Sequence, residues 1–329
     1  MHTDCINERG VSASVYEYAK NLMTLGHTPE WYYDGLSHAN NNQSIDHFSK
    51  EIQITPYKKF ELVSKGAARN FDMAYFQKAG QKDIHVIPDI PNAIHAVFNI
   101  YDKHGDYYAY ISEWLAKAAT RIRSAPLRSV RRRIQNPFSQ LEYVPYLVDL
   151  PEVEDDARRE LGVPEDAFVA MTMGGKQSFD IPWVKKTISS LIEESKDFYF
   201  LAVNTEKFIE HPRAIFVPAT SEKRRKVQLL NTGNVFIHAR TLGESFGMAL
   251  LEAMRTKIPI LSWGNGLDRN HMKMLDKECL YLNSKDLIQG VAKIRSGLFS
   301  ESVRVNFVRS LEYSAENVMK RFCEVFKIS

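Results

Sequence analysis

The segment from Val235 to Pro259 (VFIHARTLGESFGMALLEAMRTKIP) constrains the fold of this chain most strongly. It opens with a short apolar run that is typical of a buried strand, and a polar loop follows. Apolar residues then recur at helical spacing from Met248 to Met254, which predicts a helix. Pro259 begins a second apolar run. A strand, a helix and a strand in this order indicate an α/β protein with a parallel sheet.

Two carboxylates bracket the start of the predicted helix. Glu244 lies in the loop, and seven residues separate it from Glu252. Gly247 and Met248 lie where the helix begins, so Glu252 follows Met248 by one turn, roughly 6 Å along the helix axis. The open amides of a helix start can bind phosphate, and carboxylates accept hydrogen bonds from sugar hydroxyls. The spacing therefore suits a nucleotide sugar.

This segment resembles the Glu-x7-Glu signature of retaining GT-B glycosyltransferases, the large family that includes sucrose synthases and mannosyltransferases. The family motif commonly reads E-G-F-G-x-x-x-x-E-A-M-A, and this chain has E-S-F-G from Glu244 and E-A-M from Glu252. The resemblance implies a GT-B fold, in which two Rossmann-like domains carry parallel sheets that face across a cleft. It also implies that a hexosyl group passes from a nucleotide-sugar donor to an acceptor with retention at the anomeric carbon, without a metal or other cofactor.

The resemblance also implies roles for individual residues. Glu244 would contact the donor sugar as a catalytic residue, and Glu252 would bind the ribose. The backbone of Phe246, Gly247 and Met248 would meet the sugar and the phosphate. The donor would thus be held around the start of one helix.

The expected phosphate clamp departs from the family pattern. Relatives usually carry G-R-L-x-x-x-K-G after the first strand of the second domain. This chain has G-G-K-Q-S-F-D, beginning at Gly174, in the same place. Aligned without gaps, Gly175 replaces the arginine and Asp180 replaces the lysine. We expect Lys176 and Arg240 to supply the two charges, and both to lie near the helix start at Gly247, because only there do amides and cations converge on one diphosphate.

The first half of the chain carries two further candidates. Gly10 belongs to a loop and helix that resemble the ligand-binding loop of the family, although the apolar strand that should precede it is missing or truncated. His95 lies in the run A-I-H-A-V-F, where many relatives have a histidine that contacts the donor sugar. A lone histidine on an apolar strand is also typical of a hydrogen-bonded core residue. Both interpretations of His95 stay open.

Two other classes of protein compete with the transferase. The run G-E-S-F-G fits the nucleophile elbow of α/β-hydrolases, with Ser245 as nucleophile and Asp268 and His271 downstream. An elbow places its serine directly after a strand, yet four residues from Ala239 to Leu242 intervene here. The altered clamp also permits a degenerate homologue that binds a sugar nucleotide without catalysis.

The order of strand and helix signals predicts the domains. We expect an acceptor-side Rossmann-like domain at 1–149, a nucleotide-sugar-binding domain at 150–306, and a last helix at 307–329 that crosses back to the first domain. In the second half we predict strands at 168–173, 198–203, 214–217, 235–239, 259–262 and 279–281. In the first half we predict a helix from Ser12 to Leu25, a strand from Tyr108 to Ile111 with Ser112 capping the next helix, and apolar segments at 31–33, 52–54, 73–75, 84–87 and 94–98.

Composition narrows the choice further. The chain has 329 residues with a net charge of +3, which gives it no general attraction to nucleic acid. Its three cysteines form no C-x-x-C pair, and no H-E-x-x-H, EF-hand or Asp-x-Asp motif predicts a metal site. No apolar run approaches the roughly 20 residues that span a bilayer. We therefore expect a cytoplasmic protein.

Six arginines crowd the stretch from Arg121 to Arg133. Such a run is either a solvated face or an acceptor-side patch for an anionic membrane or acidic acceptor. The second interpretation would place the protein at the periphery of a membrane. No aromatic residue interrupts the run, which argues against single-stranded nucleic acid. The sequence does not reveal whether the acceptor is a glycan, a lipid or a protein glycan.

Overall fold

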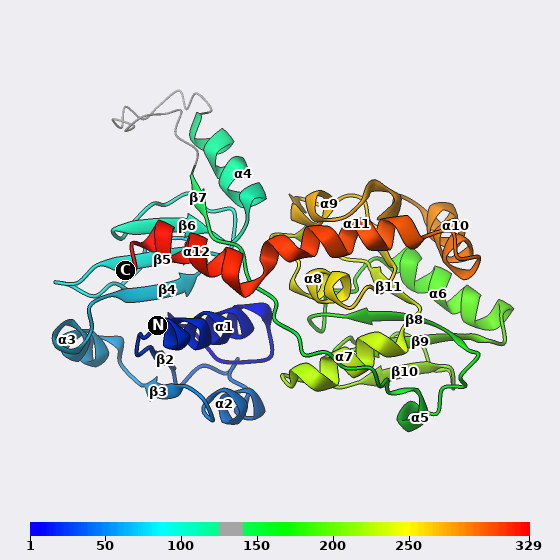
Figure 1. The fold of residues 1–329 in the computed structure, drawn as a ribbon, viewed down its shortest axis with the longest axis horizontal. Coiled ribbons are helices and arrows are strands. Elements are labelled where there is room, and N and C mark those ends of the chain that lie inside the picture. The colour runs from blue at the N-terminus through cyan, green and yellow to red at the C-terminus, as the bar shows by residue number, and fades with distance from the viewer. Residues whose placement is uncertain (125–140) are drawn as a thin grey trace. The chain divides into compact units, whose positions relative to one another are not determined.

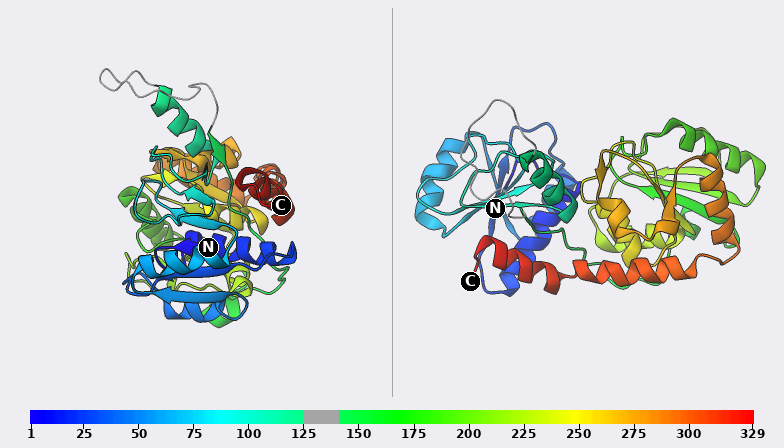
Figure 2. Two further views of the ribbon diagram at one scale, coloured as in Figure 1. Left: turned by 90° about the vertical axis from the view of Figure 1, so that its left-hand side faces the viewer. Right: turned by 90° about the horizontal axis from the view of Figure 1, so that it is seen from above.

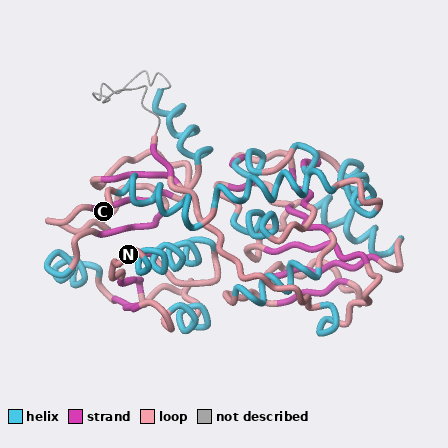
Figure 3. The backbone as a smooth tube through the Cα atoms, in the orientation of Figure 1, coloured by secondary structure: helices cyan, strands magenta, loops and turns pink. Residues whose placement is uncertain are grey.

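A computed structural model of the chain describes residues 1–124 and 141–329. Within these ranges the chain divides into two compact units, 1–147 together with 315–329, and 148–314. In both units, helices and strands alternate along the chain, as Figure 3 shows. The main sheet of each unit is parallel throughout, so the predicted α/β class is confirmed.

The first unit is built on a sheet with the strand order β3-β2-β1-β4-β5-β6-β7. Its strands are β1 (His2–Thr3), β2 (Glu30–Asp34), β3 (Gln53–Tyr57), β4 (Ala74–Lys78), β5 (Asn92–Ala96), β6 (Tyr107–Tyr110) and β7 (Glu142–Tyr143). Its helices are α1 (Gly10–Thr24), α2 (Asn42–Phe48), α3 (Phe60–Asn70), α4 (Glu113–Ser124) and α12 (Ala315–Phe326).

The first strand is present in the centre of this sheet, but it is only two residues long. His2 is in register with Tyr32 of β2 and with Phe76 of β4. The hydroxyl of Thr3 accepts a hydrogen bond from the indole of Trp31 at 2.9 Å. Side chains therefore help a short backbone ladder to hold this strand in place.

Aromatic side chains join α1 and α12, which lie beside one another in Figure 1. The ring of Tyr18 lies 4.7 Å from that of Phe322. Phe322 and Phe326 are fully buried and also contact Tyr75 of β4. The last helix thus completes the core of the first unit.

The second unit has a main sheet with the order β10-β9-β8-β11-β13-β15 and a small sheet formed by β12 and β14. Its strands are β8 (Phe168–Met173), β9 (Phe198–Val203), β10 (Ala214–Val217), β11 (Val235–His238), β12 (Gly243–Glu244), β13 (Ile260–Trp263), β14 (Asp268–Arg269) and β15 (Leu280–Tyr281). Its helices are α5 (Arg158–Leu161), α6 (Pro182–Glu194), α7 (Lys223–Thr232), α8 (Met248–Arg255), α9 (Asn270–Met274), α10 (Ser284–Arg295) and α11 (Ser300–Ser310), with 3-10 turns at Lys277–Cys279 and Leu311–Tyr313.

The winding of this sheet reverses between β8 and β11. The chain runs outward from β8 to β10, returns to pair β11 with β8, and then continues to β13. Because parallel crossovers are right-handed, α7 and α8 cover one face while α6 covers the other. α10 packs against α6, so it belongs to that second face. Figure 2 shows the strands of this unit flanked by helices.

Most predicted elements are found within three residues of their expected bounds, but two differ in kind. The apolar segment at 84–87 is not a strand, because Asp83 accepts hydrogen bonds from Lys78 and from the His85 amide and holds the segment in a loop. The last helix is not continuous over 307–329. The 3-10 turn at Leu311–Tyr313 separates α11, which ends at Ser310, from α12, which begins at Ala315.

The core contact of α12 leads to a stability prediction. Replacement Phe322→Ala should lower the free energy of unfolding by about 3–5 kcal/mol, because it empties a fully buried site between α1 and β4. The matched control is Phe98→Ala, since the Phe98 side chain is 52% exposed. Urea unfolding measures both values. Equal losses in the two variants would contradict the assignment of α12 to this core.

Candidate functional site

Two loops meet where the winding of the second sheet reverses. One follows β8 and contains Gly174 to Asp180, and the other follows β11. The amide of Asp180 donates to the carbonyl of Ala239 at 3.0 Å, and its carboxylate accepts from the amide of Thr241 at 2.6 Å. Ligands of open parallel sheets bind at the carboxyl ends of the strands beside such a reversal. The loops that carry Lys176 and Arg240 are therefore joined at the expected edge.

Glu244 is positioned by the small sheet. β12 pairs with β14, which brings Gly243 opposite Asp268. Gly243 has a φ of +73°, and a Cβ atom there would lie 2.0 Å from the Asp268 carbonyl oxygen. Only glycine fits this close approach. The backbone geometry at Gly243 thus fixes where the next side chain, Glu244, projects.

Two basic side chains bind the carboxylate of Glu244. Oε2 accepts from Arg240 Nη1 at 3.0 Å, and Oε1 lies 3.3 Å from His238 Nε2. Burial by itself raises the pKa of Glu244, but the His238 hydrogen bond and the charges of His238 and Arg240 outweigh it, so the net pKa lies below its ordinary value. The other ring nitrogen of His238 bonds the Ser262 hydroxyl at 2.8 Å. Glu244 is therefore held as a carboxylate.

The start of α8 lies between the two glutamates. Its N-cap residue is Gly247, with a φ of +101°, and no side chain caps the helix. Phe246 is buried, and its carbonyl accepts from Asn270 Nδ2 at 2.7 Å. The first amides of a helix have no carbonyl partner within it, so Met248 and the residues after it present donors to an anion. A phosphate at this helix start stays a prediction.

Glu252 is buried one turn further along α8, and its side chain is only 8% exposed. Oε1 accepts from Lys226 Nζ of α7 at 2.8 Å. Among the described residues none donates a hydrogen bond to Oε2. Oε2 does not belong to the fully buried side-chain atoms that lack a hydrogen-bond partner. It is therefore accessible to solvent. Glu252 can therefore accept a ligand hydroxyl while Lys226 compensates its charge.

The remaining candidates occupy different surroundings. Lys176 is exposed, its carbonyl accepts from the Glu206 amide at 3.1 Å, and its ammonium has no partner among the described residues. Arg240 is partly exposed and is bound to Glu244. Gly10 is the first residue of α1 in the first unit. The roles of these residues toward a ligand stay predictions.

His95 lies in the core of the first unit. It is fully buried on β5, where Nδ1 bonds the Tyr75 hydroxyl at 2.6 Å and Nε2 bonds the Val144 carbonyl at 2.8 Å. Burial lowers its pKa to about 4. Both ring nitrogens are engaged, so His95 offers neither to a ligand in this conformation. The structure favours the core interpretation over contact with the donor sugar.

His238 and Lys226, which bind the two glutamates, are not among the residues predicted from the sequence. His238 could have been found, because it ends a buried parallel strand and so faces the ligand edge. Lys226 could not, since it lies in α7 and no motif connects it with Glu252. Three-dimensional contact alone reveals this pair.

The hydrolase constellation is not assembled. Ser245 follows β12 of the small sheet rather than a strand of the main sheet. His271 accepts from the Glu244 amide through Nδ1 at 3.3 Å, and its Nε2 bonds the Trp263 carbonyl at 2.9 Å. Burial, with the charge of His238, lowers the pKa of His271 to about 4. Both nitrogens serve the backbone, so His271 is not arranged as a base for Ser245.

The basic residues at the start of α7 are paired with acids. Lys223 lies 3.4 Å from a carboxylate oxygen of Asp149, and Arg224 lies 2.9 Å from one of Asp155. Arg225 binds Glu160 at 2.6 Å. These pairs anchor the entry to the second unit.

The predicted membrane patch falls largely outside the described residues. Arg121 and Arg123 lie in the last turn of α4, but their side chains belong to the undescribed part, as do Arg128 to Arg133. In the described ranges, no helix combines the length and apolar character needed to cross a membrane. Contact with a membrane surface stays a prediction.

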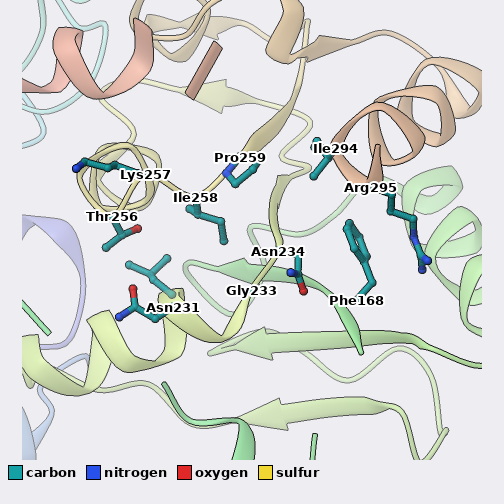
Figure 4. A pocket seen from close by; sticks show the side chains of 11 residues that line it. Phe168, Asn231, Gly233, Asn234, Thr256, Lys257, Ile258, Pro259, Ile294 and Arg295 are labelled. Atoms are coloured by element: carbon teal, nitrogen blue, oxygen red, sulfur yellow. The ribbon is translucent and has the colours of Figure 1, made fainter. Parts of the chain in front are cut away.

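A cavity of about 500 Å³ opens at the opposite edge of the second sheet. Its lining includes Phe168, Asn234 and Pro259, which stand at the amino ends of β8, β11 and β13 (Figure 4). The two loops that Asp180 joins leave the carboxyl ends of β8 and β11. This cavity is therefore separate from the site around Glu244.

Comparison with solved structures defines the fold class. The structure of Anabaena HepE, crystallised with UDP and glucose, aligns with this chain at 13% identity and a TM-score of 0.72. The alignment covers 100% of this chain and 98% of the HepE chain. A glycosyltransferase from Rickettsia africae matches 99% and 97% at 13% identity and a TM-score of 0.69. WaaG, a glycosyltransferase involved in lipopolysaccharide biosynthesis, matches 100% and 99% at 10% identity and a TM-score of 0.64.

These similarities show the GT-B fold, with two Rossmann-like domains, as the sequence predicted. No protein-family model matches the chain, and no curated protein matches its sequence. At identities of 10–13% the likeness establishes the fold. The activity has to be argued from the residues of the site.

The position of Gly243 yields a prediction for the site. Gly243→Ala should destabilise the second unit by roughly 1–3 kcal/mol or more, because the residue is held at positive φ against the Asp268 carbonyl. Gly175→Ala is the matched control, since a Cβ atom there meets open space. Thermal unfolding measures the two effects. A tolerated Gly243→Ala would contradict the close β12–β14 approach.

The buried His95 predicts a pH dependence of stability. The unfolded chain binds a proton on this residue near its ordinary pKa of about 6.5, whereas the folded chain does so only near pH 4. Stability should therefore be lost as the pH falls from 6.5 to 4, by up to about 3 kcal/mol. Urea unfolding at several pH values should show a smaller loss for His95→Gln.

The exposed residue His38 supplies the control variant, His38→Gln. The His38→Gln variant makes the same substitution at a histidine outside the core. A pH profile of His95→Gln that runs parallel to the wild-type profile would contradict the assignment of this proton linkage to His95.

Proposed function

We propose that this protein is a glycosyltransferase that moves a hexosyl group from a nucleotide-sugar donor to an acceptor, with retention at the anomeric carbon. The donor binds at the carboxyl edge of the second sheet. The observation that carries the proposal is the pair Glu244 and Glu252, set on either side of the uncapped start of α8. HepE, which shares the fold, was crystallised with UDP-glucose.

The two glutamates bind different parts of the donor. Glu252 has one oxygen bound by Lys226 and one that accepts no hydrogen bond from a described residue, which suits a ribose hydroxyl. Glu244 is kept charged by His238 and Arg240 and is placed to meet hydroxyls of the sugar. Between them, the α8 amides receive the diphosphate. Each polar part of a nucleotide sugar thus has a partner of suitable chemistry.

The leaving nucleotide needs positive charge as the glycosidic bond breaks. Arg240 is 35% exposed, so its guanidinium can turn from Glu244 toward a diphosphate. Lys176 lies on the adjoining loop, and its ammonium has no partner in the part of the chain that the structure describes. Fixed donors and cations aimed at developing charge supply the largest share of such catalysis. We assign leaving-group stabilisation to these side chains and the α8 amides, without a metal at the phosphate.

Retention follows if the acceptor attacks the face from which the nucleotide leaves. In the family that the sequence resembles, this path requires no protein nucleophile. Ser245 accordingly has no covalent role. NMR of the product formed from an α-linked donor would display an α linkage, and a β linkage would overturn this part of the proposal.

The first experiment screens UDP-, GDP- and ADP-sugars for thermal stabilisation of the full chain and for slow donor hydrolysis. Stabilisation with hydrolysis by one donor class supports the transferase. Stabilisation without turnover in the presence of candidate acceptors would favour the non-catalytic homologue. Added Mg²⁺ or Mn²⁺ should leave turnover unchanged, because no metal is assigned to the phosphates.

Substitution of Glu252 tests the ribose contact. Glu252→Gln should weaken nucleotide binding by roughly 10- to 150-fold, because a charge-assisted hydrogen bond is worth about 1.5–3 kcal/mol. Lys226 loses its partner in this variant, so the double variant Lys226→Met, Glu252→Gln separates lost stability from lost affinity. Calorimetric titration measures binding. Unchanged affinity in the folded variants would refute the contact.

Two control variants complete this test. Glu210→Gln changes a glutamate whose side chain is 84% exposed and should leave binding unchanged. Ser245→Ala should keep most of the activity, whereas a serine hydrolase would lose several orders of magnitude. Covalent labelling of Ser245 by a fluorophosphonate probe would rank the hydrolase first.

A further inference from the structure

Three potential metal ligands converge at the carboxyl edge of the first sheet. His2 belongs to β1, Asp4 follows that strand, and His85 lies in the loop after β4. One ligand atom from each of the three lies within 4.8 Å of the other two. The winding of this sheet reverses between β1 and β4, so the cluster occupies its ligand-binding edge.

Each of the two histidines has a buried ring nitrogen that forms no hydrogen bond with a described residue. His2 is only 4% exposed, and its Nδ1 is buried and forms no hydrogen bond. Nδ1 of His85 is also buried and forms no hydrogen bond with a described residue, although it lies 3.4 Å from Asp83 Oδ2. The His85 ring stacks on that of His2 with centroids 4.9 Å apart. Buried polar atoms are nearly always satisfied, and an orphaned nitrogen in a native protein calls for an explanation, such as a bound water or ion.

The hydrogen bond of His2 leaves its other ring nitrogen available for a metal. Its Nε2 lies 2.7 Å from the Tyr57 hydroxyl. If Nε2 carries the proton and donates it to Tyr57, Nδ1 keeps its lone pair. Metal-binding histidines are usually oriented by such a bond from the other ring nitrogen. Tyr57 thus serves as the outer partner of His2.

Charge at the cluster favours a cation. The nearby Lys78 is neutralised by Asp83 at 2.6 Å, and Asp83 also accepts from the His85 amide at 2.8 Å. This pair fixes the loop that carries His85. Asp4 is exposed, and its carboxylate has no hydrogen bond or ion pair with a described residue. Asp4 therefore contributes a carboxylate that no ion pair with a described residue occupies.

We propose that His2, Asp4 and His85 bind a divalent transition-metal ion, with Zn²⁺ as the best match. Two imidazoles and one carboxylate suit Zn²⁺, whereas Mg²⁺ and Ca²⁺ prefer oxygen ligands. Ligand atoms around a tetrahedral Zn²⁺ are about 3.4 Å apart, as bond lengths of about 2.1 Å require. The cluster must contract on binding, and a fourth position stays open to solvent.

The ion would stabilise the position of the short strand β1. β1 is two residues long and central in its sheet. A metal held by His2 and His85 joins this strand to the loop after β4 through bonds that the backbone ladder cannot provide. Any ion that binds the folded chain and not the unfolded chain raises stability. Zn²⁺ should accordingly raise the melting temperature.

The experiment uses the full chain without a histidine tag, stripped of metal with a chelator and then dialysed. Calorimetry titrates it with Zn²⁺ and, separately, with Mg²⁺, and thermal unfolding is followed with each ion. The expected results are one Zn²⁺ per chain, a rise in melting temperature with Zn²⁺, and no effect of Mg²⁺. An equal response to Mg²⁺ would overturn the imidazole assignment.

Variants assign the site to its residues. Asp4→Asn and His85→Gln should each weaken Zn²⁺ binding at least tenfold and remove the rise in melting temperature. His104→Gln is the matched control, because His104 also has a buried, unpartnered ring nitrogen but belongs to no ligand cluster among the described residues. Unchanged Zn²⁺ affinity in the two ligand variants, or equal loss in His104→Gln, would overturn the proposal.

A second readout needs no variant. Zn²⁺ should protect His85, whose side chain is partly exposed, from modification by diethyl pyrocarbonate in the wild-type chain, as mass spectrometry of the peptides would show. Equal modification with and without Zn²⁺ would also overturn the site. This outcome is independent of sugar transfer, because it reports on the first unit alone.

Discussion

The reversal of winding between β8 and β11 is the constraint on which the candidate site depends. Two parallel strands lie side by side, but their following loops leave in opposite directions and open a crevice at the carboxyl edge. The backbone and carboxylate of Asp180 tie these loops together. The loop after β11 then leads into β12 and α8, which carry Glu244 and Glu252. The same reversal in the first sheet, between β1 and β4, places His2, Asp4 and His85 at one edge.

Each glutamate of the site is accompanied by its own cation before any ligand arrives. Lys226 binds Glu252, and Arg240 with His238 binds Glu244. A buried carboxylate without a partner would take up a proton and lose its strength as an acceptor. These pairs keep both groups charged inside a protein unit. Arg240 is the most exposed of the three, so it is the one whose partner a bound diphosphate can replace.

The sequence predicted the second unit best because its strands are buried on both faces. Such strands read as continuous apolar runs, and β8 was located to the residue. The same rule led to a wrong prediction for the segment at 84–87, because a hydrogen bond to Asp83 holds this apolar run in a loop. The helix start at Gly247 could be read from spacing and resemblance. The Lys226–Glu252 pair and the cluster around His85 could not, because residues distant in sequence meet only in the fold.

The altered phosphate clamp has a structural explanation in Asp180. The family pattern places a lysine there, but in this chain the carboxylate accepts from the Thr241 amide at 2.6 Å while the backbone bonds Ala239. A lysine at 180 has no acceptor and could not make the first of these bonds. The chain has thus replaced a cation by a connection between two loops. That connection fixes the backbone on both sides of Arg240, which is held against Glu244 and which we propose as the source of the charge lost at position 180.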